Sequence, residues 1–236
     1  MKPRISAQDG KTRLFAHRGA SATAKENTIG AFVLALELGA DGLASEAWLT
    51  ADGQAVLDRD GRVGGRFRRR RFGALDRASI PDHVPSIDDI YDVCVESTNL
   101  LLDIHDPDAM APIVDAARNV GKGAEDRLWL RHDELEVLTE WRRDTAAKLV
   151  LRARLNAGES QERLANRLRE RGVDALSLSH REWSGGLVTL LHRFDRYALA
   201  TDLVHEREMA KLLDIGIDAI SSPHVDRMIA VGAQFT

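Results

Sequence analysis

The chain has 236 residues, of which 44% are apolar and 30% charged, a balance typical of a soluble globular protein rather than a disordered or membrane-embedded one. The formal net charge of −4 argues against a nucleic-acid partner, and no apolar run approaches the roughly 20 residues that stable insertion into a bilayer requires. The N-terminal sequence MKPRISAQDGKTR lacks the apolar stretch of a signal peptide and Cys94 is the only cysteine, so we expect a cytoplasmic protein without internal disulfides.

Eight short apolar runs recur along the chain and predict β-strands. Runs of four to eight largely apolar residues are typical of parallel strands that are covered on both faces. They lie at 14–19, 42–49, 100–105, 128–132, 148–154, 175–180, 196–202 and 218–222. Segments with helical spacing of apolar residues lie between them, at 28–38, 107–119, 133–143, 160–171 and 205–213. A further helical segment, IDDIYDVCVE, contains Cys94, which we expect to be a buried structural thiol.

This order of elements predicts an α/β protein with a parallel sheet. Eight repeats of strand and helix favour a closed (β/α)8 TIM barrel, and 236 residues is a length typical of one such domain. We therefore expect residues 1–236 to form a single barrel domain. A doubly wound open sheet would produce a similar order of elements and stays open as the alternative.

Polar or ionisable residues stand at the C-terminal ends of all eight predicted strands. In a barrel these ends converge on one rim, where the active site lies. A single such residue only marks the point at which a strand gives way to a loop, but eight successive examples favour a polar pocket. The residues are His17, Arg18, Glu46, Asp103, His105, Arg131, His132, Arg152, Arg154, Ser179, His180, Asp202, Ser221 and Ser222.

The segment that begins at Phe15, FAHRGASATAKENTIGAFVLALELGADGLASEAWLTADG, resembles the opening of glycerophosphodiester phosphodiesterases. The pattern of that family is A-H-R-G-A, E-N-T, L-x-x-G-A-D-G-I-E-x-D and L-T-x-D-G, followed by an H-D pair. LLLDIHDP and LLDIGIDAISSPHVDRM resemble later parts of the same family. The resemblance implies a TIM barrel of the phosphatidylinositol-phosphodiesterase-like type and a hydrolase of lipid metabolism that acts on phosphodiesters.

The resemblance also implies roles for individual residues. In the family, carboxylates hold a divalent cation that neutralises the phosphodiester, and two histidines transfer protons. His17 matches the first catalytic histidine, and Arg18 matches an arginine that contacts phosphate. Glu26 and Asn27 keep the E-N-T motif, which helps to shape the site. Asp103 keeps a carboxylate at the third metal-binding position.

Several positions depart from the family at the chemical centre. The first metal-binding glutamate falls on Ala44, its paired aspartate on Glu46, and the usual lysine after the third strand on His105. The second histidine falls on Arg59, and arginine cannot release a proton near neutral pH. Ordinary metal-dependent hydrolysis is therefore expected to be impaired.

The expected site follows from these matches and departures. It has catalytic positions His17, Glu46 and Arg59, phosphate contacts from Arg18, Arg59 and His105, and a weak or absent metal site at Glu46 and Asp103. The cofactor is expected to be weakly bound Mg²⁺ or Ca²⁺, or no metal at all.

Three functions stay open from the sequence. The protein is an enzyme acting on a phosphodiester or another phosphorylated small molecule, a non-catalytic pseudoenzyme that binds such an anion, or an enzyme of altered, metal-free chemistry in the same pocket. The basic run RFRRRR, which includes Arg68–Arg71, is most often a solvated loop or a subunit contact. Its role, the oligomeric state and the identity of the substrate are not predicted.

Overall fold

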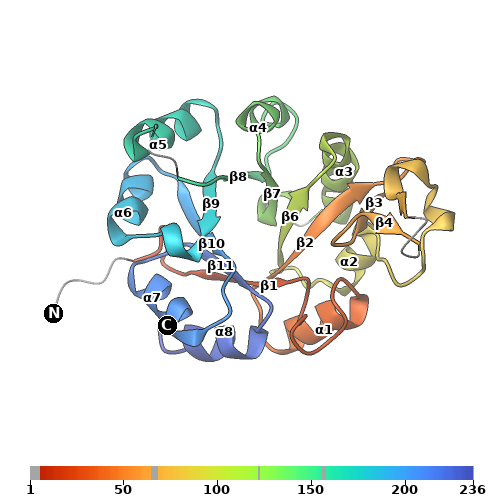
Figure 1. The fold of residues 1–236 in the computed structure, drawn as a ribbon, viewed down its shortest axis with the longest axis horizontal. Helices are drawn as coiled ribbons and strands as arrows, with labels where there is room; N and C mark the ends of the chain where they lie inside the picture. The colour runs from red at the N-terminus through yellow and green to blue at the C-terminus, as the bar shows by residue number, and fades with distance from the viewer. Residues whose placement is uncertain (1–5, 65–68, 122, 156–157, 236) are drawn as a thin grey trace.

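The computed structural model describes residues 6–64, 69–121, 123–155 and 158–235 (Figure 1). Eight strands run parallel to their neighbours and form a barrel, and an additional strand extends the sheet beside β2. The eight are β1 (Arg13–His17), β2 (Gly42–Leu49), β6 (Asn99–Ile104), β7 (Leu128–His132), β8 (Lys148–Arg152), β9 (Ala175–Ser179), β10 (Tyr197–Thr201) and β11 (Ala219–Ser222). Each of these eight strands lies in or overlaps a run predicted from the sequence.

The sheet closes on itself, which decides between the two predicted architectures. Its order is β1-β11-β10-β9-β8-β7-β6-β2-β3, and a further pairing between β1 and β2 joins the ends of the eight-stranded part. In this pairing His17 lies opposite Ala44. The (β/α)8 barrel is thus confirmed, and the open sheet is excluded. The assignment of residues 1–236 to a single domain stays a prediction.

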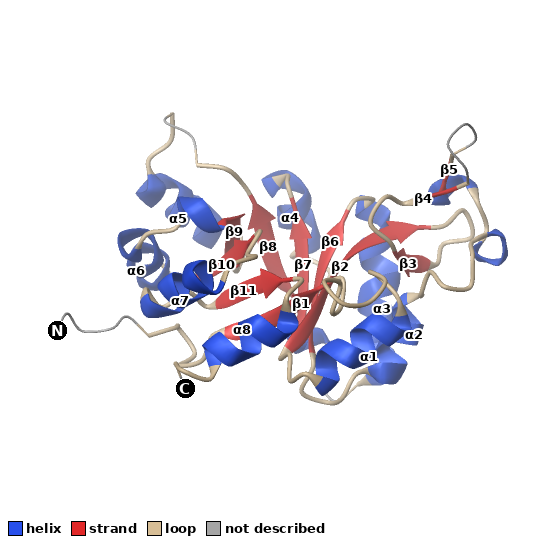
Figure 2. Ribbon diagram, turned by 60° about the horizontal axis from the view of Figure 1, so that its bottom comes forward, coloured by secondary structure: helices blue, strands red, loops and turns tan. Residues whose placement is uncertain are grey.

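Helices cover the outside of the barrel (Figures 1 and 2). Their bounds are α1 (Ile29–Glu37), α2 (Ile87–Val93), α3 (Met110–Val120), α4 (Leu135–Trp141), α5 (Gln161–Glu170), α6 (Gly185–Arg193), α7 (Glu206–Asp214) and α8 (Val225–Gly232). Hydroxyls of Thr28, Ser86, Ser160 and Ser184 accept backbone N–H groups at the starts of four of them. None of the helices in the described part of the chain is long and apolar enough to cross a bilayer.

One helix boundary differs from the prediction at Cys94. Helix α2 ends at Val93, and Cys94 is already in an extended conformation with ψ 138°. The chain leaves the helix here because it turns toward β6, and the hydroxyl of Thr98 accepts the N–H of Val95 at 3.1 Å in that turn. The thiol is half-buried rather than buried inside a helix, and burial raises its pKa to about 11.

The segment between β2 and α2 forms a small excursion beside the barrel (Figure 2). Strand β3 (Ala55–Leu57) pairs antiparallel with β2, and β4 (Arg62–Val63) pairs with β5 (Arg70–Arg71). Part of the predicted basic run, residues 66–68, lies outside the described residues. The remaining members, Arg69, Arg70 and Arg71, are exposed.

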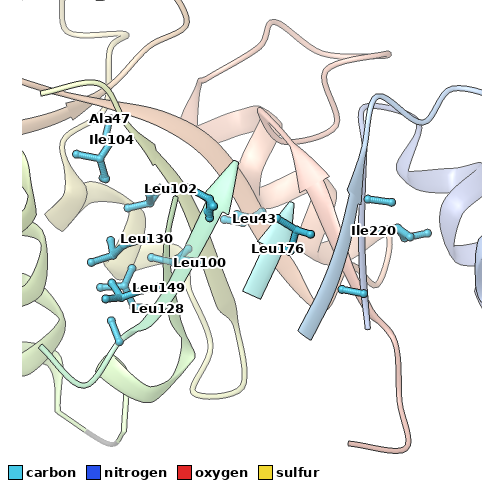
Figure 3. Packing of buried hydrophobic residues seen from close by; sticks show 14 of the residues in the cluster. Leu43, Ala47, Leu100, Leu102, Ile104, Leu128, Leu130, Leu149, Leu176 and Ile220 are labelled. Carbon is cyan, nitrogen blue, oxygen red and sulfur yellow. The ribbon is translucent and has the colours of Figure 1, made fainter. Parts of the chain in front are cut away.

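Alternate residues of each strand face opposite sides of the barrel wall, as the period of two requires. One set packs outward against the helices, and Figure 3 shows part of this cluster, including Leu43, Leu100, Leu102, Leu130 and Leu149. The other set faces inward, and its lower part forms a second apolar cluster with one residue from each strand: Phe15, Ala44, Leu101, Trp129, Val150, Ala175, Leu199 and Ala219. Because this layer fills the barrel, a pocket can open only above it, toward the C-terminal strand ends.

A half-buried carboxylate at the opposite end of the barrel, Glu125, provides a test of stability against pH. Glu125 accepts Nε and Nη2 of Arg118, both at 2.9 Å, and the hydroxyl of Thr145 at 2.7 Å. The Arg118 guanidinium and these other donors lower the pKa of Glu125 to about 2. A lowered pKa stabilises the fold above the unfolded value of about 4.3, and this contribution is lost as the pH falls toward 2.

We therefore expect Glu125→Gln to destabilise the protein at pH 6 by about 1–2 kcal/mol, allowing for solvent screening, and by much less at pH 2.5. Urea unfolding of both proteins at the two pH values measures the difference. Arg118→Met should remove the same pH-dependent part. A wild-type advantage that is equal at both pH values would contradict the assignment.

Candidate functional site

A pocket of about 1010 Å³ opens at the C-terminal ends of the strands. Its wall includes His17, Arg18, Glu46 and Asp103, four of the residues predicted from the sequence. Arg131, Arg152 and Arg154 add cations to the same wall, and hydroxyls of β9, β10 and β11 line the far side. The pocket lies directly above the apolar layer that fills the barrel, so its floor is closed.

The first group of side chains comes from β1 and β2. Arg18 follows the last residue of β1 and has a left-handed backbone (φ 55°), with its N–H donating to the carbonyl of Ala44 at 2.6 Å. Its Nε and Nη2 donate to Oε1 of Glu46 at 2.8 and 2.5 Å, and Nε also reaches Oε2 at 3.1 Å. Nε2 of His17 lies 3.9 Å from Oε1 of Glu46. Both oxygens of Glu46 are thus engaged by one guanidinium.

Two residues of the E-N-T motif, Glu26 and Asn27, form hydrogen bonds with the side chains of this group. Asn27 is buried with φ 53°, its Nδ2 donates to Oε2 of Glu46 at 3.3 Å, and its Oδ1 accepts the hydroxyl of Ser45 at 2.8 Å. Glu26 accepts Nη1 of Arg18 at 2.9 Å through one oxygen and Nη1 of Arg59 at 2.6 Å through the other. The motif therefore orients Glu46 and links the two arginines that were predicted to hold phosphate.

Glycine is required immediately after Arg18. Gly19 has φ +74°, and a Cβ at this position would lie 2.6 Å from the carbonyl carbon of Ala31 in α1. The close approach of the turn to α1 brings Arg18 back over the barrel mouth. The A-H-R-G-A sequence is thus a geometric requirement of the pocket as well as a set of polar groups.

The second group comes from β6, β7 and β8 and centres on Asp103. Nε of Arg131 donates to Oδ1 of Asp103, and Nη2 donates to Oδ2 at 2.5 Å. Nη1 of Arg131 also donates to the hydroxyl of Ser177 at 3.1 Å. Nη1 of Arg152 approaches Oδ2 of Asp103 at 3.3 Å, while the rest of its guanidinium pairs with Asp133. Asp103 and Arg131 are each only 5% exposed, so this is a buried ion pair.

Arg59 and His105, also predicted from the sequence, lie beside the pocket and not in its wall. Half of the Arg59 side chain is exposed, and its guanidinium reaches the site only through Glu26. The ring of His105 stacks on Trp48 with centroids 4.4 Å apart. His132 and His180 also lie outside the wall: Nδ1 of His132 accepts the N–H of Glu134, and His180 lies 3.3 Å from Glu208.

Burial and charge set the protonation states in the pocket. Burial lowers the pKa of His17 below its ordinary value, and Glu46 only partly opposes this effect. His17 is therefore neutral near pH 7 and can accept a proton. Burial alone would raise the pKa of Asp103, but Arg131 and Arg152 hold it below its usual range, so Asp103 is ionised.

The donor set does not fit a divalent cation. Such an ion needs several free oxygen ligands, but Arg18 engages both oxygens of Glu46 and Arg131 engages both oxygens of Asp103. Ala44 lies in the apolar layer beside Phe15 and Trp129. Across the described ranges, no group of three or more His, Cys, Asp or Glu side chains is placed to hold a metal.

Sequence reasoning noted Arg131, Arg152 and Ser221 as strand-end residues but gave them no role. Arg131 is the inward-facing arginine of LWLRH, and a charged inward position in a buried strand was the signal available. Ser221 lines the pocket at 2% exposure, and its Oγ has no hydrogen-bond partner within the described chain. A buried hydroxyl left without a partner is a group that a ligand can satisfy.

Known proteins resemble this chain in two ways: some match its N-terminal quarter in sequence, and solved structures match its barrel fold. The sequence pattern of the Glycerophosphoryl diester phosphodiesterase family matches residues 17–74. A glycerophosphodiester phosphodiesterase of Caldanaerobacter subterraneus subsp. tengcongensis is 51% identical over 53 residues, which span 22% of this chain and 22% of that protein. The matched segment is thus about a fifth of the relative's length.

Solved structures resemble the whole barrel. A glycerophosphodiester phosphodiesterase from Thermotoga maritima superimposes with a TM-score of 0.81 at 16% identity, covering 93% of this chain and 98% of that one. A phosphodiesterase from Oleispira antarctica, in complex with the product sn-glycerol-3-phosphate, superimposes with a TM-score of 0.79 at 17% identity, covering 96% and 98%. At these identities the likeness establishes the shared fold.

Proposed function

The chain belongs to the glycerophosphodiester phosphodiesterase family, a family of phosphoric diester hydrolases, and on this premise we propose that its rim pocket binds a small phosphate-bearing ligand without using a metal. The observation that carries the proposal is the set of four arginines, Arg18, Arg131, Arg152 and Arg154, in the wall of one pocket. Members of the family generally depend on a divalent metal. Here guanidinium groups supply the positive charge instead.

The arginines keep donors for a ligand although each is already paired. A guanidinium has five N–H groups. Arg18 and Arg131 each donate through Nε, Nη1 and Nη2 to protein atoms, which leaves one N–H on each Nη. Planar N–H pairs match phosphate oxygens. The hydroxyl of Ser221 adds a donor on the opposite wall.

The ligand class is supported by the fold relative from Oleispira antarctica, which holds sn-glycerol-3-phosphate. Glycerol 3-phosphate and glycerophosphodiesters are therefore the first ligands to test. In the same proposal, the partner is a small molecule and not a nucleic acid, and the protein acts in the cytoplasm. The half-buried, unpaired Cys94 is compatible with a reducing compartment.

A second candidate function is slow, metal-free phosphodiester cleavage, and the geometry of His17 favours it. His17 is neutral near pH 7 and lies 3.9 Å from Glu46, so its imidazolium form would be stabilised after it accepts a proton. The hydroxyl of the substrate next to the phosphate would lose its proton to His17 and attack phosphorus, forming a cyclic phosphate as the P–O bond to the leaving group breaks, and the departing alkoxide would take its proton from water. Arg59 cannot protonate that alkoxide, which limits the rate.

Arg18→Met tests the binding proposal. We expect the wild-type protein to bind glycerol 3-phosphate in EDTA, and the variant to bind about 10- to 100-fold more weakly, because hydrogen bonds to charged groups contribute about 1.5–3 kcal/mol. Isothermal titration calorimetry measures both affinities.

Arg143→Met is the matched control. Arg143 is exposed on the loop between α4 and β8, at the end of the barrel away from the pocket, and its loss should leave the affinity unchanged. Equal binding by Arg18→Met and wild type, or no binding by the wild-type protein, would reject the proposed ligand class.

A further inference from the structure

We propose that Arg131 is the resident cation of this pocket: its guanidinium holds the position on Asp103 that the family gives to a divalent metal. The inference rests on the proposed function, which it deepens by naming the group that replaces the metal. It predicts that the site recognises phosphate with a fixed organic cation, so that metal ions neither assist binding nor compete with it.

The position of Arg131 in the sheet makes this replacement possible. Asp103 and Arg131 are paired positions of the neighbouring strands β6 and β7, and Glu46 is the partner of Asp103 on β2. The side chains of all three enter the pocket at the same height above the apolar layer. The guanidinium of Arg131 therefore lies at the same height in the barrel as the carboxylates of Glu46 and Asp103, the two predicted metal ligands.

The side chain of Arg131 is buried and held in place by hydrogen bonds to the walls of the pocket. It is 5% exposed, its Nε and Nη2 donate to the two oxygens of Asp103, and its Nη1 donates to the hydroxyl of Ser177 on β9. Anchors on two different strands hold the planar group in one orientation. Because the guanidinium is part of the chain itself, this cation is present in the pocket at any metal concentration.

The balance of charge around Asp103 favours phosphate over a metal ion. Arg131 and Arg152 both contact this one carboxylate, and Arg18 has already paired with Glu46. The carboxylate that the family places at position 44 is replaced by a methyl group in the apolar layer. The metal position has lost one negative charge, and a buried positive charge lies beside it. The loss of the carboxylate weakens the attraction for a divalent cation, while the guanidinium repels a cation and attracts an anion.

The effect of Asp103→Asn on the affinity for phosphate ligands distinguishes a metal site from a site in which Arg131 is the cation. If Asp103 served a metal, its loss would weaken the binding of phosphate ligands measured with Mn²⁺ present and leave binding in EDTA unchanged. If Arg131 is the cation, the change removes the anion that competes for the guanidinium, and affinity for glycerol 3-phosphate in EDTA should rise at least about threefold. Asp144→Asn, at the far end of the barrel, is the matched control and should leave the affinity unchanged.

Arg131 variants then test the cation itself. Arg131→Met should bind glycerol 3-phosphate at least about tenfold more weakly than the wild-type protein, the loss expected for one charge-assisted contact. If this variant does not fold, Asp103→Asn/Arg131→Met removes both charges together and should show the same loss relative to Asp103→Asn. Circular dichroism checks the fold of each protein. Unchanged affinity in a folded Arg131 variant, or unchanged or weaker binding by Asp103→Asn in EDTA, would overturn the inference.

A metal titration distinguishes this failure from failure of the proposed function. Calorimetry with Mn²⁺ should show no site in the wild-type protein and a new site in Ala44→Glu/Arg131→Leu, which restores a carboxylate and frees Asp103. If the wild-type protein binds no phosphate ligand but the metal results hold, the ligand class is wrong and the replacement of the metal stands. If the wild-type protein binds Mn²⁺ and loses it in Asp103→Asn, Arg131 has not replaced the metal.

Discussion

Hydrolysis of glycerophosphocholine by this protein is expected to be at least about 10²- to 10⁴-fold slower than the roughly 1–10³ per second typical of enzymes, because a general acid is missing. Arg59 stands at the position of the second family histidine, where it is half exposed and bound to Glu26. It cannot release a proton to the departing alkoxide. The two carboxylates of the pocket, Glu46 and Asp103, are engaged by Arg18 and Arg131 and not free to hold a metal, which lowers the rate further. Release of choline in the presence of Mg²⁺ or Ca²⁺ measures the activity.

Restoring the residues typical of the family should restore metal-dependent hydrolysis, provided that the cation on Asp103 is also removed. The sequence suggests Ala44→Glu, Glu46→Asp and Arg59→His, which restore the family residues. We expect this triple variant to stay nearly inactive, because Arg131 still occupies Asp103. Adding Arg131→Leu should raise metal-dependent hydrolysis well above that of the triple variant. Turnover at a typical enzymatic rate by the unmodified protein would show that another group supplies the second proton transfer.

Replacement of Arg131 alone is expected to cost about 3–5 kcal/mol of stability, because it leaves a buried carboxylate with most of its compensation removed. Arg152 remains near Asp103 but makes only one contact, at 3.3 Å. Asp103→Asn/Arg131→Met removes both members of the pair and should cost much less than Arg131→Met. Urea unfolding of the two single variants and the double variant gives the coupling free energy of the pair.

The control for this cycle is Arg143→Met, an exposed change that should alter stability by less than about 0.5 kcal/mol. Costs that simply add in the double variant would show that Asp103 and Arg131 do not depend on each other. The ion pair would then be a minor feature of the pocket and a poor explanation for the loss of the metal site.

Local patterns in the sequence were sufficient for the strands and most of the helices, and they favoured a barrel without excluding an open sheet. Each of the eight barrel strands is a short apolar run, and six of the helices named above overlap a segment with helical spacing of apolar residues, so these elements can be recognised within windows of about ten residues. Helices α6 and α8 lie outside the predicted helical segments. The convergence of His17, Arg18, Glu46 and Asp103 on one pocket follows from the same information. In a parallel barrel, every strand delivers its last inward-facing residue to the same rim. The family resemblance singled out the A-H-R-G-A turn after the first strand as part of the site.

The partners within the pocket depended on tertiary structure. Arg131 lies 28 residues from Asp103, and only the register between β6 and β7 places the two side chains opposite each other. The register also decides that Ala44 lies in the apolar layer, one step below the charged groups. A sequence shows which residues a strand carries, but the height of each residue in the barrel depends on how all eight strands are staggered when the sheet closes. For that reason the sequence by itself determined the strands, most of the helices and the rim on which the pocket lies. Only the tertiary structure decided that the sheet closes through the pairing of β1 with β2, and that a guanidinium contacts the predicted metal ligand.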